Sequence, residues 1–114
     1  MELENKVVVV TGAASGIGKA MVERFHREGA AAVVAADIDE AGAAATARSV
    51  GGWSMRVDVS RESDIVTLIE ETETRFGPID LFCSNAGIGV GRGLDEPDDV
   101  WQKIWEVNTL SHVY

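Results

Sequence analysis

The sequence has 114 residues, of which 46% are hydrophobic and 25% charged, so it is globular in composition and long enough for one domain at most. No apolar run approaches the roughly 20 residues that cross a bilayer, and the polar start MELENK does not resemble a signal peptide. The net charge of −9 argues against nucleic-acid binding, and the single cysteine excludes an internal disulfide. We therefore expect a cytoplasmic protein with no membrane or nucleic-acid partner.

Strands and helices alternate along the chain. The apolar run 6–11, with four consecutive valines, predicts a strand buried on both faces, and apolar residues at helical spacing then predict a helix that ends near Gly29. Three similar units follow, with strands at 32–36, 53–59 and 79–84 and helices at about 39–50, about 65–76 and from Pro97 onward. The connections are too long for hairpins, so the pattern predicts an α/β fold with a doubly wound parallel sheet.

The stretch TGAASGIG follows the first strand and opens the first helix. A helix that starts there presents backbone N–H groups at the positive end of its dipole, and glycines let a pyrophosphate approach them. We assign Gly12 to the tight turn, Gly16 to close approach of the ligand and Gly18 to packing of helix against strand. The glycines by themselves also fit a tight turn that binds no ligand.

Asp37 favours a glycine-rich turn that binds a pyrophosphate over a turn that binds no ligand. It follows the second strand, 19 residues after Gly18, where a dinucleotide-binding unit places the acid that accepts hydrogen bonds from the adenosine ribose. Such a carboxylate repels a 2′-phosphate. No basic residue stands beside it to bind that phosphate, since Ser15 precedes Gly16 and Ile38 follows Asp37. The sequence therefore predicts NAD rather than NADP, while Asp39 is the better candidate for a helix cap.

These features resemble the short-chain dehydrogenase/reductase family. TGAASGIG resembles the cofactor loop TGxxxGxG of that family, and three further segments occur in the family's order: DVS at 58–60, SNAG at 84–87 and EVNTL at 106–110. The resemblance extends over the whole chain but over only about the first half of a typical member. It implies a Rossmann-like sheet of order 3-2-1-4, with 1–114 as the N-terminal part of a single dinucleotide-binding domain.

The resemblance also implies roles for individual residues. The side chain of Asp58 would contact the adenine amino group, and the backbone amide of Val59 would contact the ring. Asn85 would tie strands together, and Ser84 stands where the family usually has another asparagine. The adenosine side would be lined by Ala86 and Gly87. The pyrophosphate would be held by Gly12, Ser15, Gly16, Ile17 and Gly18.

Asn108 is the one candidate catalytic residue. It lies on the apolar stripe of the last predicted helix, three residues after Trp105 and four after Ile104. A buried asparagine needs partners for its amide, so it is either a structural plug or the holder of a water molecule. The resemblance favours the water, because the family has an Asn–Ser–Tyr–Lys tetrad.

The tyrosine and lysine of that tetrad form a YxxxK motif, which this sequence lacks. Its one tyrosine, Tyr114, is the last residue and has no lysine after it. In the family the tyrosine is the general acid/base of hydride transfer between the nicotinamide and an alcohol or ketone. We therefore expect a NAD-dependent oxidoreductase represented by its cofactor-binding half and inactive alone.

Two other functions stay open, namely a NAD-binding sensor or interaction module and a remnant without function. We expect a homo-oligomer, because strand 79–83 would be an exposed apolar edge and the helix from Pro97 belongs to the subunit interface in the family. Cys83 is expected in the core, His26 at the surface, and the loop 87–96 with Arg92 in solvent.

Overall fold

A computed structural model describes residues 2–14 and 16–85 of the chain, and the last predicted helix and the loop 87–96 lie outside them. The predicted alternation of strands and helices is confirmed within these residues. The elements are β1 (Val7–Thr11), α1 (Gly16–Arg27), β2 (Ala32–Asp37), α2 (Glu40–Val50), β3 (Trp53–Arg56), α3 (Glu62–Phe76) and β4 (Leu81–Cys83). The four strands are parallel and run in the order β3-β2-β1-β4, as predicted.

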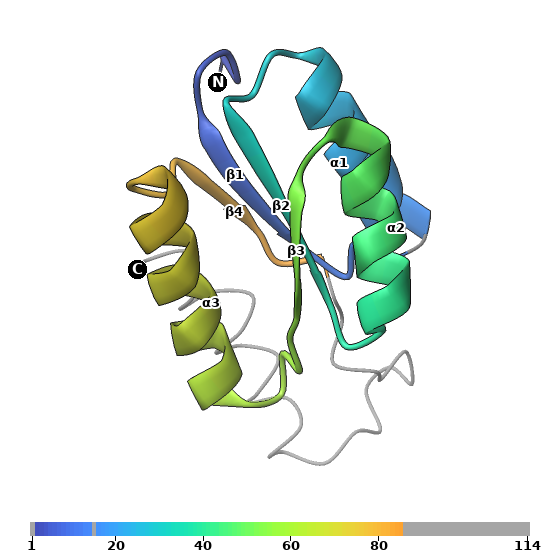
Figure 1. The fold of residues 1–114 in the computed structure, drawn as a ribbon, viewed down its shortest axis with the longest axis vertical. Coiled ribbons are helices and arrows are strands. Elements are labelled where there is room, and N and C mark those ends of the chain that lie inside the picture. Colours follow the sequence, from blue (N-terminus) through green and yellow to red (C-terminus); the bar gives the residue numbers. More distant parts are fainter. Residues whose placement is uncertain (1, 15, 86–114) are drawn as a thin grey trace, which may run out of the picture.

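Helices cover both faces of the sheet, with α1 and α2 on one face and α3 on the other (Figure 1). The valines of β1 serve both layers in alternation. Val8 and Val10 pack in the cluster under α1 and α2, whereas Val9 packs in the cluster under α3. All three are fully buried, and each burial stabilises the fold by about 1.5–3 kcal/mol. This explains why the strand is a continuous apolar run rather than an alternating one.

The ends of α2 agree with the signals in the sequence. Asp39 caps its start, because the side chain accepts a hydrogen bond of 3.0 Å from the backbone N–H of Gly42. Gly51 ends it in the left-handed conformation, with φ of 66°, and donates to the carbonyls of Ala47 and Arg48.

Two strands are shorter than predicted. β3 ends at Arg56 instead of 59, because the N–H of Val57 makes a last bond to the carbonyl of Asp37 and the chain then turns. β4 begins at Leu81 instead of 79. Just before it, the carboxylate of Asp80 accepts the N–H of Val7 at 2.8 Å and fastens the start of β1 to the start of β4.

β3 and β4 are the outer strands of the described sheet. The ring of Trp53 on β3 packs edge-on to Phe76, and the guanidinium of Arg75 lies 4.5 Å from the centroid of the Trp53 ring. His26 is exposed, as expected. No helix within 2–14 and 16–85 is both long and apolar enough to span a membrane.

Candidate functional site

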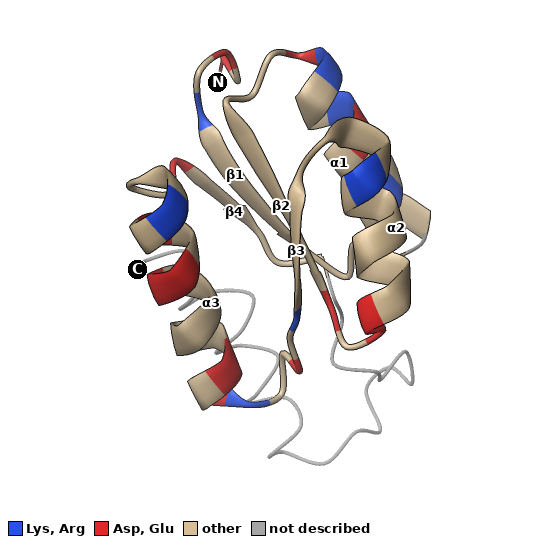
Figure 2. Cartoon of the chain, in the orientation of Figure 1, with Lys and Arg blue, Asp and Glu red and all other residues tan. Residues whose placement is uncertain are grey.

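The carboxyl ends of the four parallel strands meet at one edge of the sheet, where open α/β sheets bind ligands. The glycine-rich turn follows β1 here, and Asp37 ends β2. Asp58 lies two residues beyond β3, and Asn85 lies two beyond β4. Acidic and basic residues both occur at this edge (Figure 2). The fold therefore brings together candidate residues from four segments of the sequence.

The three glycines of the turn differ in what surrounds them. Gly12 and Gly16 have φ of 67° and 61°, a conformation that residues with a side chain rarely adopt. At Gly18 a Cβ would overlap the carbonyl of Gly12 and lie 2.8 Å from Nδ2 of Asn85, so close packing requires a glycine there. At Gly16 a Cβ would meet no atom of the described residues within 4 Å. The start of α1 thus faces open space.

Asp37 joins two segments of this edge through its carboxylate. Its Oδ2 accepts the N–H of Ala14 at 3.0 Å, and its Oδ1 accepts the N–H of Asp39 at 2.9 Å. A carboxylate has about four acceptor positions, so each oxygen can still accept a hydrogen bond from a ligand hydroxyl. The side chain is held in place by the protein and keeps capacity for a ribose.

Asn85 links β4 to the glycine turn. Its Nδ2 donates to the carbonyl of Gly12 over 3.4 Å, and its backbone N–H donates to the carbonyl of Cys83. That same carbonyl accepts a bond of 3.3 Å from the hydroxyl of Thr11. These contacts connect the segment after β4 to the end of β1 and to the turn that follows it.

Asp58 forms a compact turn with Ser60. Its Oδ1 accepts the hydroxyl of Ser60 at 2.6 Å and the N–H of Ser60 at 3.0 Å. These two bonds stabilise the charged form and hold the pKa of Asp58 below its usual value of 3.8, with a smaller effect from the charges of Arg61 and Arg56. The backbone N–H of Asp58 donates to the carboxylate of Asp64, so the turn is anchored to the first turn of α3. Asp58 is therefore an anion at neutral pH.

Two large apolar side chains are exposed at this edge. Ile17, near the start of α1, is 72% exposed, whereas the inward stripe of the helix is made by Val22, with Met21 and Phe25 partly buried. Ile38, directly after Asp37, is 55% exposed. Exposed apolar surface beside open backbone N–H groups is typical of a site that binds a partly apolar ligand.

Sequence reasoning missed two residues of this edge. Gly42 on α2 packs so closely to the glycine turn that a Cβ there would lie 2.7 Å from Cβ of Ala14. Arg56, the last residue of β3, is in register with Asp37. Arg56 is distant from Asp37 in the chain and becomes its neighbour only through the register of β2 and β3, which local sequence patterns do not specify.

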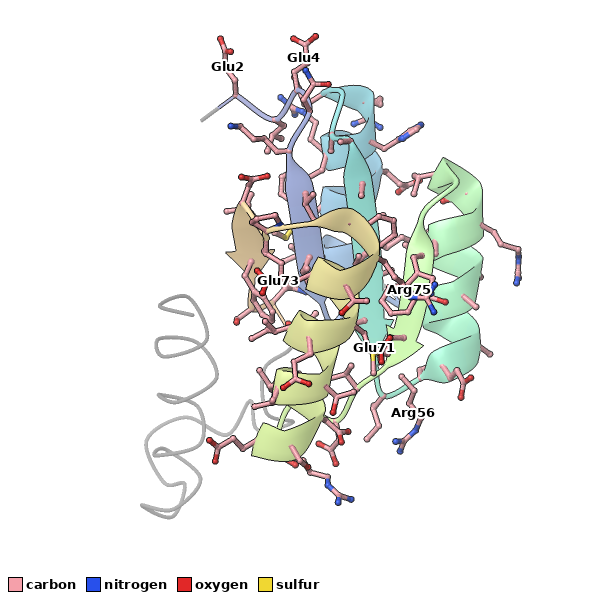
Figure 3. The ribbon with its side chains drawn as sticks, turned by 60° about the vertical axis from the view of Figure 1, so that its left-hand side comes forward. Glu2, Glu4, Arg56, Glu71, Glu73 and Arg75 are labelled. Atoms are coloured by element: carbon pink, nitrogen blue, oxygen red, sulfur yellow. The ribbon has the colours of Figure 1, made fainter. Side chains whose placement is uncertain are left out.

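Val59, also a predicted site residue, is partly buried and packs against the cluster under α3. The other predicted site residues, Ser15, Ala86, Gly87 and Asn108, lie outside the described residues. A hollow lies at the opposite end of the sheet, between the N-terminal segment and α1, and is lined by Glu2, Glu4, Arg24 and Phe25 among others. Figure 3 places Glu2 and Glu4 far from Arg56. The hollow is therefore separate from the site at the strand ends.

The residues at the strand ends fit a dinucleotide. The open space at Gly16 admits a pyrophosphate to the first N–H groups of α1, which have no partner within the helix. Asp37 has spare acceptor capacity for a ribose, and Ile38 offers an apolar surface next to it. The arrangement can hold a nucleotide cofactor by backbone donors at one point and by a carboxylate at another.

Comparisons with known proteins agree with this geometry. The chain is 43% identical to tropinone reductase-like 1 of Erythroxylum coca over 81% of its own length and 34% of that protein's. It is 34% identical to 3beta-hydroxysteroid dehydrogenase 2 of Eggerthella lenta, over 98% of its own length and 45% of that protein's. A crystal structure of hydroxysteroid dehydrogenase from Escherichia coli superposes with a TM-score of 0.75 at 30% identity, covering 96% of this chain and 48% of that one.

The chain thus spans less than half the length of these relatives. The family model described as short chain dehydrogenase matches residues 6–114, nearly the whole sequence. With this match, and with the glycine turn, Asp37 and the 3-2-1-4 sheet in place, the chain belongs to the short chain dehydrogenase family.

Proposed function

We propose that this chain is the cofactor-binding part of a NAD-dependent oxidoreductase that transfers hydride to or from an alcohol or ketone. Residues 1–114 would then be the N-terminal part of a single dinucleotide-binding domain. The observation that carries the proposal is the open space in front of Gly16, at the start of α1 and beside a carboxylate fixed at the end of β2. Membership of an oxidoreductase family that uses nicotinamide cofactors supports it.

The described residues of the site would contribute binding rather than chemistry. Backbone N–H groups of the turn 12–18 would hold the pyrophosphate, and Asp37 would accept both ribose hydroxyls. Asp58 and Val59 would meet the adenine, and Asn85 would keep the turn in place through its bond to Gly12. When bound, the cofactor supplies the hydride acceptor or donor.

The proposed preference for NAD rests on the charge of Asp37. Its carboxylate is fixed by two backbone N–H groups, so it cannot easily turn away from a 2′-phosphate. A 2′-phosphate in contact with the carboxylate of Asp37 would be repelled, whereas a 2′-hydroxyl in the same place would donate a hydrogen bond to it. The repulsion costs more free energy than that hydrogen bond contributes.

Catalysis needs more than these residues. The sequence holds no YxxxK motif, so we propose that residues 1–114 alone do not transfer hydride and that Asn108 contributes to a proton relay only in a complete active site. A small alcohol or ketone substrate and a homo-oligomeric state are part of the same proposal. The location in the cytoplasm stays a prediction.

Titration of the purified protein with NADH, followed by nicotinamide fluorescence, tests the proposed cofactor site. The variant Gly16→Ala places a methyl group in the open space and should weaken NADH binding at least tenfold. Gly51→Ala is the matched control, because Gly51 has nearly the same φ, 66° against 61°, and also has nothing within 4 Å of its Cβ position.

Both variants therefore carry a similar backbone strain of about 1–2 kcal/mol, but only one of them changes the site. Equal NADH affinity of the two variants, or no binding by the unmodified protein, would contradict the proposal. Tighter binding of NADPH than of NADH would contradict the cofactor preference alone.

A further inference from the structure

Arg56 and Asp37 lie side by side at the carboxyl edge of the sheet. They are paired in the parallel register of β2 and β3, in which neighbouring strands run about 4.8 Å apart. Ala36 and Met55, one residue earlier on each strand, both pack on the α3 side. Because side chains alternate along a strand, Asp37 and Arg56 both project to the opposite face.

The guanidinium of Arg56 is available to a ligand. The residue is exposed, and no ion pair to it occurs within the described part of the chain, where the two ion pairs are Arg24–Glu28 and Arg75–Glu71. Figure 3 shows Arg56 extending outward beyond the end of β3. Asp37, although next to it, directs its oxygens to the N–H groups of Ala14 and Asp39.

The ribose hydroxyls would lie at Asp37, so a 2′-phosphate would lie within the reach of a long cationic side chain one strand away. Arginine binds phosphate through paired N–H donors, which makes these contacts among the strongest polar ones. The field of Arg56 already extends along this edge, since its charge contributes to the lowered pKa of Asp58, after the Ser60 hydrogen bonds and Arg61.

We propose that Arg56 is a specificity-determining residue of the cofactor site, whose guanidinium binds a 2′-phosphate and so limits the preference for NAD that Asp37 creates. The protein accordingly accepts NADP as a second, weaker cofactor. This inference rests on the proposed function, because it needs the ribose at Asp37.

Acidic neighbours set the size of the effect. Among the described residues at this edge are the acids Asp37, Asp39, Glu40, Asp58, Glu62 and Asp64 and the bases Arg56 and Arg61. The local balance is negative, so Arg56 reduces the repulsion of a 2′-phosphate without reversing it. NAD remains preferred, and removal of Arg56 makes the preference larger.

Two small probes isolate the 2′-phosphate from the rest of the cofactor: adenosine 2′,5′-bisphosphate and adenosine 5′-monophosphate. Their dissociation constants are measured by calorimetry for the purified protein, for Arg56→Ala and for Arg56→Lys. Arg48→Ala is the control, because it removes the same charge from an exposed position in the last turn of α2, at the other end of that helix.

We expect Arg56→Ala to weaken binding of the bisphosphate about fivefold and to leave the monophosphate within twofold. Arg56→Lys should retain part of the affinity, since it keeps the charge and loses the paired donors. The loss of bisphosphate affinity in Arg56→Ala should be smaller at high salt, where charge interactions are screened. Arg48→Ala should leave the affinity for both ligands unchanged.

Equal effects of Arg56→Ala on the two probes would overturn the inference, as would bisphosphate binding that no Arg56 variant changes. Failure of the unmodified protein to bind the bisphosphate, while it binds the monophosphate and NADH, would overturn it and leave the proposed function standing. Failure to bind all three ligands would overturn both.

Discussion

The backbone N–H of Ala14 donates a hydrogen bond of 3.0 Å to Oδ2 of Asp37, which ties the glycine-rich turn to the end of β2. The second oxygen of Asp37 accepts the N–H of Asp39, whose own side chain caps α2. Asp37, which is proposed to bind the ribose, therefore also stabilises the fold when no ligand is bound. A substitution there changes the fold and the site together.

Replacement of Asp37 tests this double role. Asp37→Ala leaves two backbone N–H groups without their acceptor and should lower the free energy of unfolding by about 1–3 kcal/mol, measured by urea denaturation. Asp37→Asn keeps one carbonyl acceptor, so its free energy of unfolding should lie between those of Asp37→Ala and the unmodified protein. Glu70→Ala, which removes an exposed acid from α3, serves as the control. An unchanged stability of Asp37→Ala would show that the Ala14 bond does not support the turn.

The glycines of the turn should differ in how much they tolerate a methyl group. Gly18→Ala forces a Cβ against the carbonyl carbon of Gly12, at 2.6 Å, and should cost about 3 kcal/mol or more of stability. Gly16→Ala meets no atom within the described part of the chain and should cost only about 1–2 kcal/mol of backbone strain. Thermal and urea unfolding of both variants measure the difference, and the reverse order of stabilities would contradict the packing described for Gly18.

Thr72 offers a substitution that should stabilise the protein. Its side chain lies on the buried side of α3, and its hydroxyl has no hydrogen-bond partner among the described residues. Thr72→Val keeps the shape and a similar helix propensity, so the free energy of unfolding should rise by about 1 kcal/mol. Thr67→Val is the control, because that hydroxyl is exposed and donates to the carbonyl of Ser63. A loss of stability in Thr72→Val would indicate that the hydroxyl has a partner after all.

Cys83 should react slowly with alkylating reagents. Burial disfavours the thiolate and raises the pKa of Cys83 above its usual value of 9.0. The rate of reaction with iodoacetamide, followed against pH, should therefore reach its midpoint above 9.0 in the folded protein and at a lower pH in urea. A midpoint well below that of the unfolded chain would instead indicate an activated nucleophile.

Asp58 should make the free energy of unfolding depend on pH in the acidic range. Its pKa in the folded protein is lowered, chiefly by the hydroxyl of Ser60, so its charged form stabilises the fold above the unfolded pKa. This contribution is lost as the pH falls through the lower, folded value. The stability advantage of the protein over Asp58→Asn should accordingly shrink below about pH 4.

Ser60→Ala gives a second measurement of the same bond. Without the hydroxyl, the pKa of Asp58 should move up toward 3.8, as followed by NMR of the carboxyl carbon. Ser49→Ala, remote on α2, should leave that pKa unchanged. A pKa that does not respond to Ser60→Ala would assign the shift to other groups.

The order of elements could be predicted from the sequence because local patterns carry it. A run of valines, the helical spacing of Ile65, Leu68 and Thr72, and glycines at helix ends each depend on residues near in the chain. Asp39 was predicted as a cap for the same reason, since a cap bonds to the next turn of its own helix. The glycine turn and the acid at the end of the second strand likewise have fixed spacing.

Contacts between distant residues were settled only by the tertiary structure. Asp80 bonds to Val7 and Asn85 to Gly12, each across 73 residues, and the shortening of β4 follows from such contacts. The exposure of Ile17 depends on how α1 sits on the sheet, which its own periodicity does not specify. Arg56 became a neighbour of Asp37 through strand register alone. Register is set by packing across the sheet, so the sequence identified the acid of the site and the fold supplied the base beside it.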